Sequence, residues 1–419
     1  MNFDDTAEEA TFRAQVRAWL DANAPKHLEP ELRRATLASS GITSEDPLAA
    51  AKAWQKKKAD AGYACLHWPK MYGGGGFSPM QRVIWQQEEG LYAMLSLIFA
   101  IGHGMCGPTL IAWASEEQKQ MRLPPLITGE EIWCQLFSEP AAGSDLANLR
   151  TRAIPAGDGT DDWIVNGQKI WTSNAQISRW GLLLARTEPG LPKHKGLTMF
   201  FLDMQSPGVA VRPIKQASGE AGFSEVYFTD VRIPDGQRLG AVNEGWKVSL
   251  TTLMNERMSI GARVSTGFPE IFELCCHLET GTGLAIDDRA VRSKLATWAA
   301  RTNGLKYTSI RAISSLSRGE TPGPENSIGK LVAGQMMQEI AAFALDLQGH
   351  AGVLTGPDLA EASAWFQTML LRSPGMRLAG GTDEVMRNII GERVLRLPGD
   401  VRVDKDIAFN QIPLTGIRV

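Results

Sequence analysis

The spacing of apolar residues changes twice along this chain, and this order limits the folds that it can adopt. Phe12, Val16 and Leu20 recur at helical spacing in the first third. From Ile132 onward, short runs of β-forming residues alternate with turn residues, which is typical of an antiparallel barrel or sandwich. Helical spacing returns from Trp246. We therefore expect an α+β fold with three domains: an N-terminal helical domain at 1–131, a central β domain at 132–241 and a C-terminal helical bundle at 242–419.

The central segment carries the most specific local pattern. Asn166-Gly167 lies between two short apolar runs, and this dipeptide suits the two positive-φ positions of a type I′ turn. It therefore predicts a hairpin between Trp163 and Ile170. Further strands are expected at 181–185, 197–202, 209–211 and 225–228.

The composition excludes several classes of protein. The 419 residues are enough for two or three folding units, and 43% hydrophobic with 21% charged residues is typical of a globular protein. A net charge of −3 gives no basic surface for nucleic acid. No apolar run is long enough to span a membrane, and the N-terminus lacks the features of a signal peptide. The five cysteines have no metal-ligand spacing, so we expect no metal site, reduced thiols and a cytoplasmic location.

The segment Cys134–Asp145 is the strongest candidate for a ligand loop. It begins as a short apolar strand, and Ser138 places a hydroxyl where that strand ends. Gly143 and Ser144 follow in a turn whose backbone N–H groups could approach an anionic group closely, because glycine has no Cβ. Taken alone, the segment is more often an ordinary turn of Pro, Gly, Ser and Asp, and the ligand loop is the alternative.

Several motifs in the same order along the chain resemble those of the acyl-CoA dehydrogenase family. The signature of that family is matched at Ser138, Glu139, Pro140, Ala142, Gly143, Ser144 and Asp145. Three further segments are similar to family motifs: Trp68-Pro69 with Tyr72–Gly74, Gly167–Asn174, and Gly380–Glu384 with Arg387-Asn388 and Glu392-Arg393. The resemblance implies a C-terminal four-helix bundle and an FAD cofactor between the β domain and that bundle.

The resemblance also implies which residues contact FAD: Phe137, Ser138, Gly143, Ser144, Trp171, Ser173, Gly381, Thr382 and Glu384. Phe137 and Ser138 would contact the isoalloxazine ring, Trp171 would stack on it, and Ser173 would hydrogen-bond to it. Ser144 is also the one residue that the resemblance implies as a contact for the CoA part of a substrate. The alternative for Trp171 is an ordinary core tryptophan, because the chain has 12 tryptophans.

The implied reaction is α,β-dehydrogenation of an acyl-CoA thioester, which needs a carboxylate base in a nearly dry place. Many family members carry this glutamate just before the Gly-Thr of the C-terminal motif, where this chain has Gly380. Other members carry it at a Glu-Arg dipeptide on a helix, which is similar to Glu256-Arg257. The resemblance therefore implies Glu256 as the base and Arg257 as its orienting partner. The Gly380 N–H would polarise the thioester carbonyl. A surface Glu-Arg pair is the alternative.

Two departures from the family pattern concern the assembly. The segment that usually supplies an arginine to the flavin of a neighbouring subunit reads Glu279–Leu284 here, and the usual Gln-x-x-Gly-Gly reads Gln348-Gly349-His350 after Asp346. Two kinds of assembly stay open: a homo-dimer or tetramer, and an α2β2 assembly with a related subunit. Family members with the α2β2 assembly often act on steroid or other bulky thioesters. The expected electron acceptor is an electron-transferring flavoprotein. The alternatives are a flavin monooxygenase or oxidase on the same fold, and a partner subunit with a vestigial site.

Overall fold

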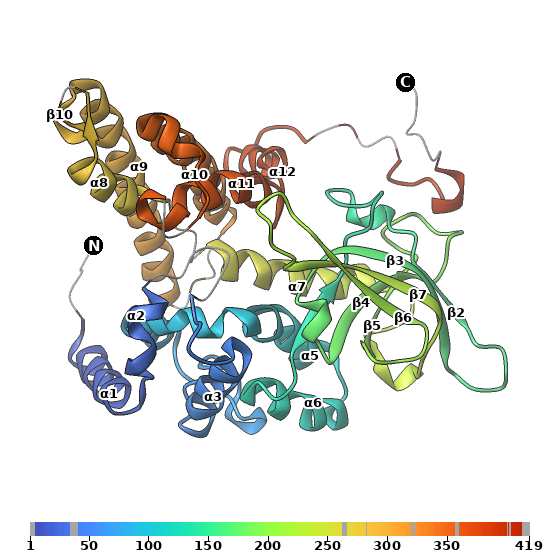
Figure 1. The fold of residues 1–419 in the computed structure, drawn as a ribbon. Helices are drawn as coiled ribbons and strands as arrows, with labels where there is room; N and C mark the ends of the chain where they lie inside the picture. Colours follow the sequence, from blue (N-terminus) through green and yellow to red (C-terminus); the bar gives the residue numbers. More distant parts are fainter. Residues whose placement is uncertain are drawn as a thin grey trace. The chain divides into compact units, whose positions relative to one another are not determined.

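The computed structural model describes residues 5–33, 41–261, 266–281, 283–318, 320, 323–356, 360–399, 401 and 404–412. The chain divides into two compact units, each assembled from separate stretches of sequence (Figure 1). The helical unit comprises Met1–Pro47, Ser78–Met94 and Arg257–Gly399, and the sheet unit comprises Leu48–Phe77, Leu95–Glu256 and Asp400–Val419. Both predicted domain boundaries, after 131 and after 241, fall inside the sheet unit and stay predictions.

The sheet unit is built on an eight-stranded sheet. Its strands are β1 (Trp133–Leu136), β2 (Arg152–Pro155), β3 (Trp163–Ser173), β4 (Trp180–Arg186), β5 (Leu197–Asp203), β6 (Val209–Ile214), β7 (Phe223–Ile233) and β8 (Arg238–Leu239). Their order is β6-β7-β3-β2-β4-β5-β8, and β1 pairs with β4 outside this path. Strand β4 is parallel to β1 and, at one residue pair, to β2, whereas all other pairs are antiparallel. The four strands predicted after the hairpin segment are confirmed.

The predicted hairpin at Asn166-Gly167 is wrong, because strand β3 runs straight through these residues. The register of β3 against β7 shifts between Val165 and Gly167, where β7 carries one extra residue, so Asn166 lies opposite a bulge in β7 at Thr229 and Asp230. The Asn166 amide donates to Asp230 Oδ1 at 2.9 Å and accepts from the Asp230 N–H at 3.0 Å. A Cβ on Gly167 would lie 2.5 Å from Thr151 Oγ1, so glycine lets strand β2 approach. A partner distant in sequence therefore overrides the local turn preference.

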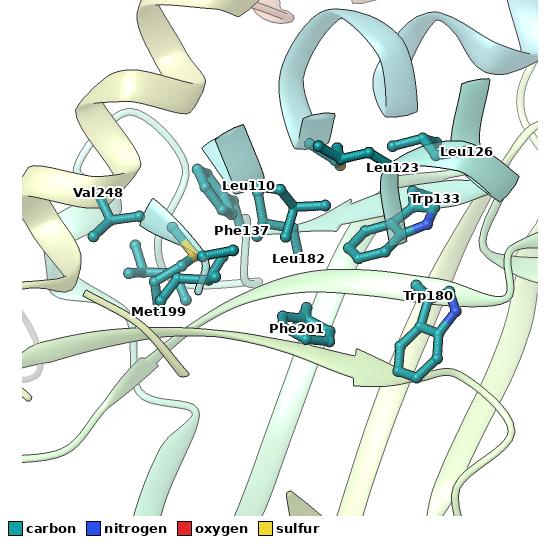
Figure 2. Packing of buried hydrophobic residues seen from close by; sticks show 14 of the residues in the cluster. Leu110, Leu123, Leu126, Trp133, Phe137, Trp180, Leu182, Met199, Phe201 and Val248 are labelled. Atoms are coloured by element: carbon teal, nitrogen blue, oxygen red, sulfur yellow. The ribbon is translucent and has the colours of Figure 1, made fainter. Parts of the chain in front are cut away.

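Helices cover one side of the sheet within this unit. They are α3 (Pro47–Asp60), α5 (Gly107–Trp113), α6 (Glu116–Thr128) and α7 (Gly245–Gly261). Figure 2 shows the core between them: Leu110 of α5 and Leu126 of α6 meet Trp133 and Leu182 from the sheet, and Val248 of α7 joins the same cluster. The Trp133 and Trp180 rings lie 5.9 Å apart. This core fixes strand β1 and helix α7 on a common apolar layer.

The helical unit holds the N-terminal and C-terminal helices. They are α1 (Ala7–Asn23), α2 (Glu29–Leu32), α4 (Pro79–Glu89), α8 (Phe268–His277), α9 (Arg289–Ser317), α10 (Ser327–Gln348), α11 (Trp365–Leu378) and α12 (Asp383–Ile389). Thr6 caps α1 in a capping box with Glu9. Met336 and Ile340 of α10 are fully buried in the core shared with α8, α9 and α11. The predicted class, with helices before and after a β domain, is confirmed.

The described residues contain no single helix that is long and apolar enough to cross a membrane. The two segments Pro79–Phe99 and Gly102–Trp113 meet that criterion only when they are combined as a bent pair.

Candidate active site

Strand β1 leads directly into the signature loop. Phe137, which is 4% exposed, packs into the core of the sheet unit beside Leu110 (Figure 2). The Ile170 N–H donates to the Ser138 carbonyl at 2.9 Å, and Lys169 Nζ donates to the Phe137 carbonyl at 3.0 Å. The start of the loop is therefore held to strand β3 through its backbone.

A buried ion pair lies beneath this loop. Lys169 Nζ is 2.8 Å from Glu139 Oε1, and both side chains are almost fully buried. Glu139 also accepts from the N–H groups of Arg150, at 2.6 Å, and Thr151, at 2.9 Å. Burial alone raises the pKa of Glu139, but the Lys169 ammonium and the Arg150 N–H outweigh it and lower that pKa below its ordinary value. The pair joins the loop to both β3 and the start of β2.

Sequence reasoning gave Lys169 no role, although a signal was present. Lys169 lies in the motif Gly167–Asn174, and its side chain is 0% exposed in a strand. A lysine among alternating strand residues is costly to bury unless an anion faces it. The two matched motifs, 138–145 and 167–174, contain only two acidic residues, Glu139 and Asp145. Glu139 was therefore a candidate partner for a buried Lys169.

Trp171 lies near the end of β3 in a backbone conformation that is rare for a bulky residue. Its φ is +59°, its side chain is 55% exposed, and its ring lies edge-on to Phe223 at 6.1 Å. The register of β3 against β7 shifts between Lys169 and Thr172, which frees the backbone to turn. The core-tryptophan alternative is therefore wrong. A strained and exposed aromatic residue is characteristic of binding sites.

Three hydroxyls without a described hydrogen-bond partner occur in Ser138 and in the two residues that follow Trp171. In the described part of the chain, neither the Ser138 hydroxyl nor the Ser173 hydroxyl has a hydrogen-bond partner, and both residues are half-buried. The Thr172 hydroxyl is fully buried and also has none. Buried polar groups are normally satisfied, so unpaired hydroxyls point to a bound polar group.

The turn that follows Ser138 is open to solvent. Glu139 and Ala142 exchange two backbone hydrogen bonds of 3.0 Å, which close the turn. Gly143 and Ser144 are exposed, and a Cβ on Gly143 would have no neighbouring heavy atom within 4 Å. The folded chain therefore does not itself require glycine here, and space is left for a bound molecule.

Glu256 lies on helix α7, whose preceding turns are fixed in the core. Thr252, one turn earlier, is buried and its hydroxyl lies 2.8 Å from that of Thr109. Trp113 Nε1 donates to Thr251 Oγ1 at 3.0 Å. The Glu256 side chain is half-buried, and its Oε2 lies 3.5 Å from Nε2 of Gln135 on strand β1. The arrangement puts a carboxylate beside the strand that leads into the signature loop.

Gln135 was also missed, although its position in the sequence was informative. Side chains alternate along a strand, so Trp133, Gln135 and Phe137 share one face of β1. Trp133 and Phe137 pack into the core shared with the helices, whereas Cys134 and Leu136 pack on the opposite side. Gln135 is thus the polar member of an otherwise apolar face.

The remaining predicted residues lie in the helical unit. Gly380 and Gly381 have φ of +66° and +102°, which favour glycine. Thr382 caps helix α12, and its hydroxyl accepts from the Val385 N–H at 3.3 Å. Glu384 is exposed, 3.8 Å from Arg387. The side chain of the predicted Arg257 lies outside the described residues. Glu256 thus lies beside strand β1 in the sheet unit, whereas the C-terminal motif belongs to the helical unit.

Comparison with known proteins finds relatives of one family along most of the chain. Three family models match: the acyl-CoA dehydrogenase N-terminal domain at 6–130, the middle domain at 134–231 and the C-terminal domain at 243–395. The acyl-CoA dehydrogenase IpdE1 of Mycolicibacterium smegmatis is 36% identical over 403 residues, covering 93% of this chain and 98% of that protein.

Solved structures show the same fold. The ChsE4-ChsE5 complex from Mycobacterium tuberculosis matches with a TM-score of 0.78 and 30% identity, over 96% of this chain and 100% of that chain. The Tcur3481-Tcur3483 steroid acyl-CoA dehydrogenase also reaches a TM-score of 0.78, at 24% identity over 96% of this chain and 100% of that chain. With all three family domains matched in order, the chain belongs to the acyl-CoA dehydrogenase family.

Proposed function

We propose that this chain catalyses the FAD-dependent α,β-dehydrogenation of an acyl-CoA thioester to the trans-2-enoyl-CoA, with electrons passing to an electron-transferring flavoprotein. The observation that carries the proposal is the place of Glu256. Its carboxylate lies beside Gln135, two residues before Phe137 on the same face of strand β1. A monooxygenase on this fold would not need a carboxylate base at this position.

The residues of the sheet unit fit a flavin. The exposed Trp171 ring offers a flat wall, and the unpaired hydroxyls of Ser138 and Ser173 offer hydrogen bonds to the polar edge of a ring system. When bound, FAD supplies the acceptor for the hydride that leaves the β-carbon. Phe137 supports the ring from the apolar side.

In the helical unit, Gly381, Thr382 and Glu384 are proposed to contribute to binding the diphosphate and ribityl part of FAD, in this chain or in a second subunit. Thr382 already accepts a hydrogen bond as the cap of α12, which fixes its hydroxyl at the start of that helix.

In this reaction, side chains of the protein would take part in one proton transfer, the removal of the α-proton of the thioester. Glu256 takes the α-proton, and Gln135 holds the carboxylate in place by donating to its Oε2. Arg257 is proposed to orient Glu256. The Gly380 N–H is proposed to donate to the thioester carbonyl, which makes the α-proton more acidic. Since Gly380 has no side chain, the site leaves room for a bulky acyl group, such as a steroid side chain.

We propose a heteromeric assembly with a related subunit in preference to a homo-oligomer. The ChsE4-ChsE5 structure is a complex of two different chains and resembles this chain at 30% identity. The segment from Glu279 to Leu284, which forms the short strands β9 (Glu279–Thr280) and β10 (Gly283–Leu284), also lacks the arginine that family members lend to a neighbouring flavin.

The proposal is tested by purifying the chain alone and adding acyl-CoA thioesters of different size under anaerobic conditions, while the visible absorbance of the flavin is recorded. Bleaching by one class of thioester is the expected result and identifies the substrate class. A flavin band that no thioester bleaches would contradict the dehydrogenase and favour an oxidase or monooxygenase, which consumes oxygen. Purification without flavin would indicate that the partner subunit completes the site.

A further inference from the structure

We propose that the segment 404–412, here named the C-terminal strap, positions the open turn Gly143–Ser144 for the CoA part of the substrate, with Lys193 as the positioning residue. The inference rests on the proposed function. Two independent sets of contacts connect the strap to the stretch that follows this turn.

The first set is an ion cluster around Lys193. Lys193 Nζ lies 3.0 and 2.9 Å from the two carboxylate oxygens of Asp145, the residue that follows Ser144. The same Nζ lies 2.6 Å from Asp404 Oδ2 at the start of the strap. Burial disfavours the Lys193 ammonium, but its hydrogen bonds to Asp404 and Asp145 raise its pKa, so the cation persists at neutral pH. One lysine thus joins the signature loop to the C-terminal end of the chain.

The second set is centred on Arg186 at the end of strand β4. Its guanidinium lies 3.8 Å from the centre of the Phe409 ring in the strap. The same group donates to the carbonyls of Lys193, at 2.8 Å, and Ala147, at 2.5 Å. Ala147 lies two residues after Asp145. Arg186 is 3% exposed, so the strap covers a charge that would otherwise face solvent.

Backbone hydrogen bonds fix the strap on the loop that carries Lys193. The Phe409 N–H donates to the Leu191 carbonyl at 2.9 Å, and the Asn410 N–H donates to the Pro189 carbonyl at 3.0 Å. Ala408 also forms an isolated antiparallel bridge with Pro192. The strap therefore cannot leave without releasing the loop, and Lys193 moves with that loop.

The consequence concerns the part of the substrate that all acyl-CoA thioesters share. Gly143 and Ser144 are exposed, and a Cβ on Gly143 would meet no heavy atom of the described residues within 4 Å, so we infer that their placement depends on Asp145 and the residues after it. A loosened strap should therefore weaken binding of the CoA part by the same factor for every thioester. The chemical step at Glu256 should be unchanged once substrate saturates the site.

The experiment compares Asp404→Asn and Phe409→Ala with the unaltered enzyme, purified with its flavin and any partner subunit. Asp406→Asn is the matched control, because Asp406 lies in the same strap, is exposed and has no charged partner among the described residues. KM and kcat are measured for a short and a bulky thioester, together with the inhibition constant of free coenzyme A. Flavin content per chain is measured by absorbance.

We expect Asp404→Asn and Phe409→Ala to raise both KM values and the inhibition constant of free coenzyme A alike, by about three- to tenfold, the range of one lost charged contact. The value of kcat and the flavin content should stay within about twofold, and Asp404→Glu should restore KM. If Phe409→Ala does not fold, Phe409→Leu removes the ring while keeping an apolar side chain.

Three results would overturn the inference. One is an unchanged KM and inhibition constant in both strap variants. Another is an increase for only one thioester, or an increase that follows loss of flavin, because the strap would then serve the acyl group or the fold. The third is an unaltered enzyme that no thioester reduces, which refutes the proposed function itself and is recognised without any variant.

Discussion

The buried pair of Lys169 and Glu139 should contribute more to the sheet unit than any exposed ion pair. Lys169→Met would leave the Glu139 carboxylate buried with only the N–H groups of Arg150 and Thr151. Removing one partner of a buried pair costs about 3–5 kcal/mol, and the two retained N–H donors place this case near about 3 kcal/mol. Glu139→Gln should cost at least as much, because the buried Lys169 ammonium would lose its counter-charge and the amide NH2 group cannot accept from the N–H groups of Arg150 and Thr151.

Thermal unfolding measures this effect. For a unit of about 200 residues, about 3 kcal/mol lowers Tm by about 6–12 °C. The double variant Lys169→Met/Glu139→Gln should lose much less than the sum of the single losses, since it leaves no unpaired charge. The matched control is Arg232→Met, which breaks an exposed pair with Asp158 and should change Tm by less than about 2 °C. Additive single losses, or single losses no larger than the control, would refute the reasoning.

The same pair predicts a pH dependence. The folded-state pKa of Glu139 is lowered, so its contribution to stability is present above the unfolded value of 4.5 and is lost as pH falls through the folded value. Between pH 7 and pH 3, Tm of the unaltered chain should therefore fall further than Tm of Glu139→Gln. Parallel curves would contradict this assignment.

Three further predictions concern the reaction. Glu256→Gln should slow anaerobic flavin bleaching by about 10²–10⁴-fold with flavin retained. Adding Gly380→Glu should not restore the rate, because the φ of +66° at that position disfavours any side chain. Recovery of bleaching would contradict the role of Glu256. Gln135→Leu should slow bleaching at saturating substrate by about fivefold, through loss of about 1 kcal/mol of positioning, and an unchanged rate would remove Gln135 from the site. Trp171→Gly should relieve the strained φ, so Tm of the flavin-free protein should rise while flavin retention weakens. A lower Tm of the flavin-free variant would show that the Trp171 conformation carries no strain.

The sequence predicted the order of the domains because that order depends on local periodicity. Helix α1 and strands β4 to β7 follow from apolar spacing within each segment, and neighbouring residues determine such spacing. The strand at Asn166 was mistaken for a turn because its partner, Asp230 in the bulge of β7, lies 64 residues away. Lys193 was not predicted at all, since its partner Asp404 is 211 residues distant.

Only some of the site residues predicted from the resemblance are linked to one another by described contacts, because such contacts join segments that are distant in the sequence. The structure brings Phe137, Ser138 and Trp171 together through the pairing of the signature loop with β3. The contributions of these three residues, of Gly143, Ser144 and Ser173, and of the C-terminal motif to a flavin site all stay predictions. Gln135 and Lys169 gain their meaning only from long-range contacts, which no single segment of the sequence reveals.

The two-sided packing of strand β1 also limits how this enzyme can diversify. Cys134 and Leu136 fill one core while Trp133 and Phe137 fill the other, so a single inserted or deleted residue would exchange the two faces. Gln135 would then enter a wholly apolar layer, and a leucine would face Glu256. New substrate preferences in this lineage should therefore arise by substitution around β1, and length changes should be confined to the loops that flank it.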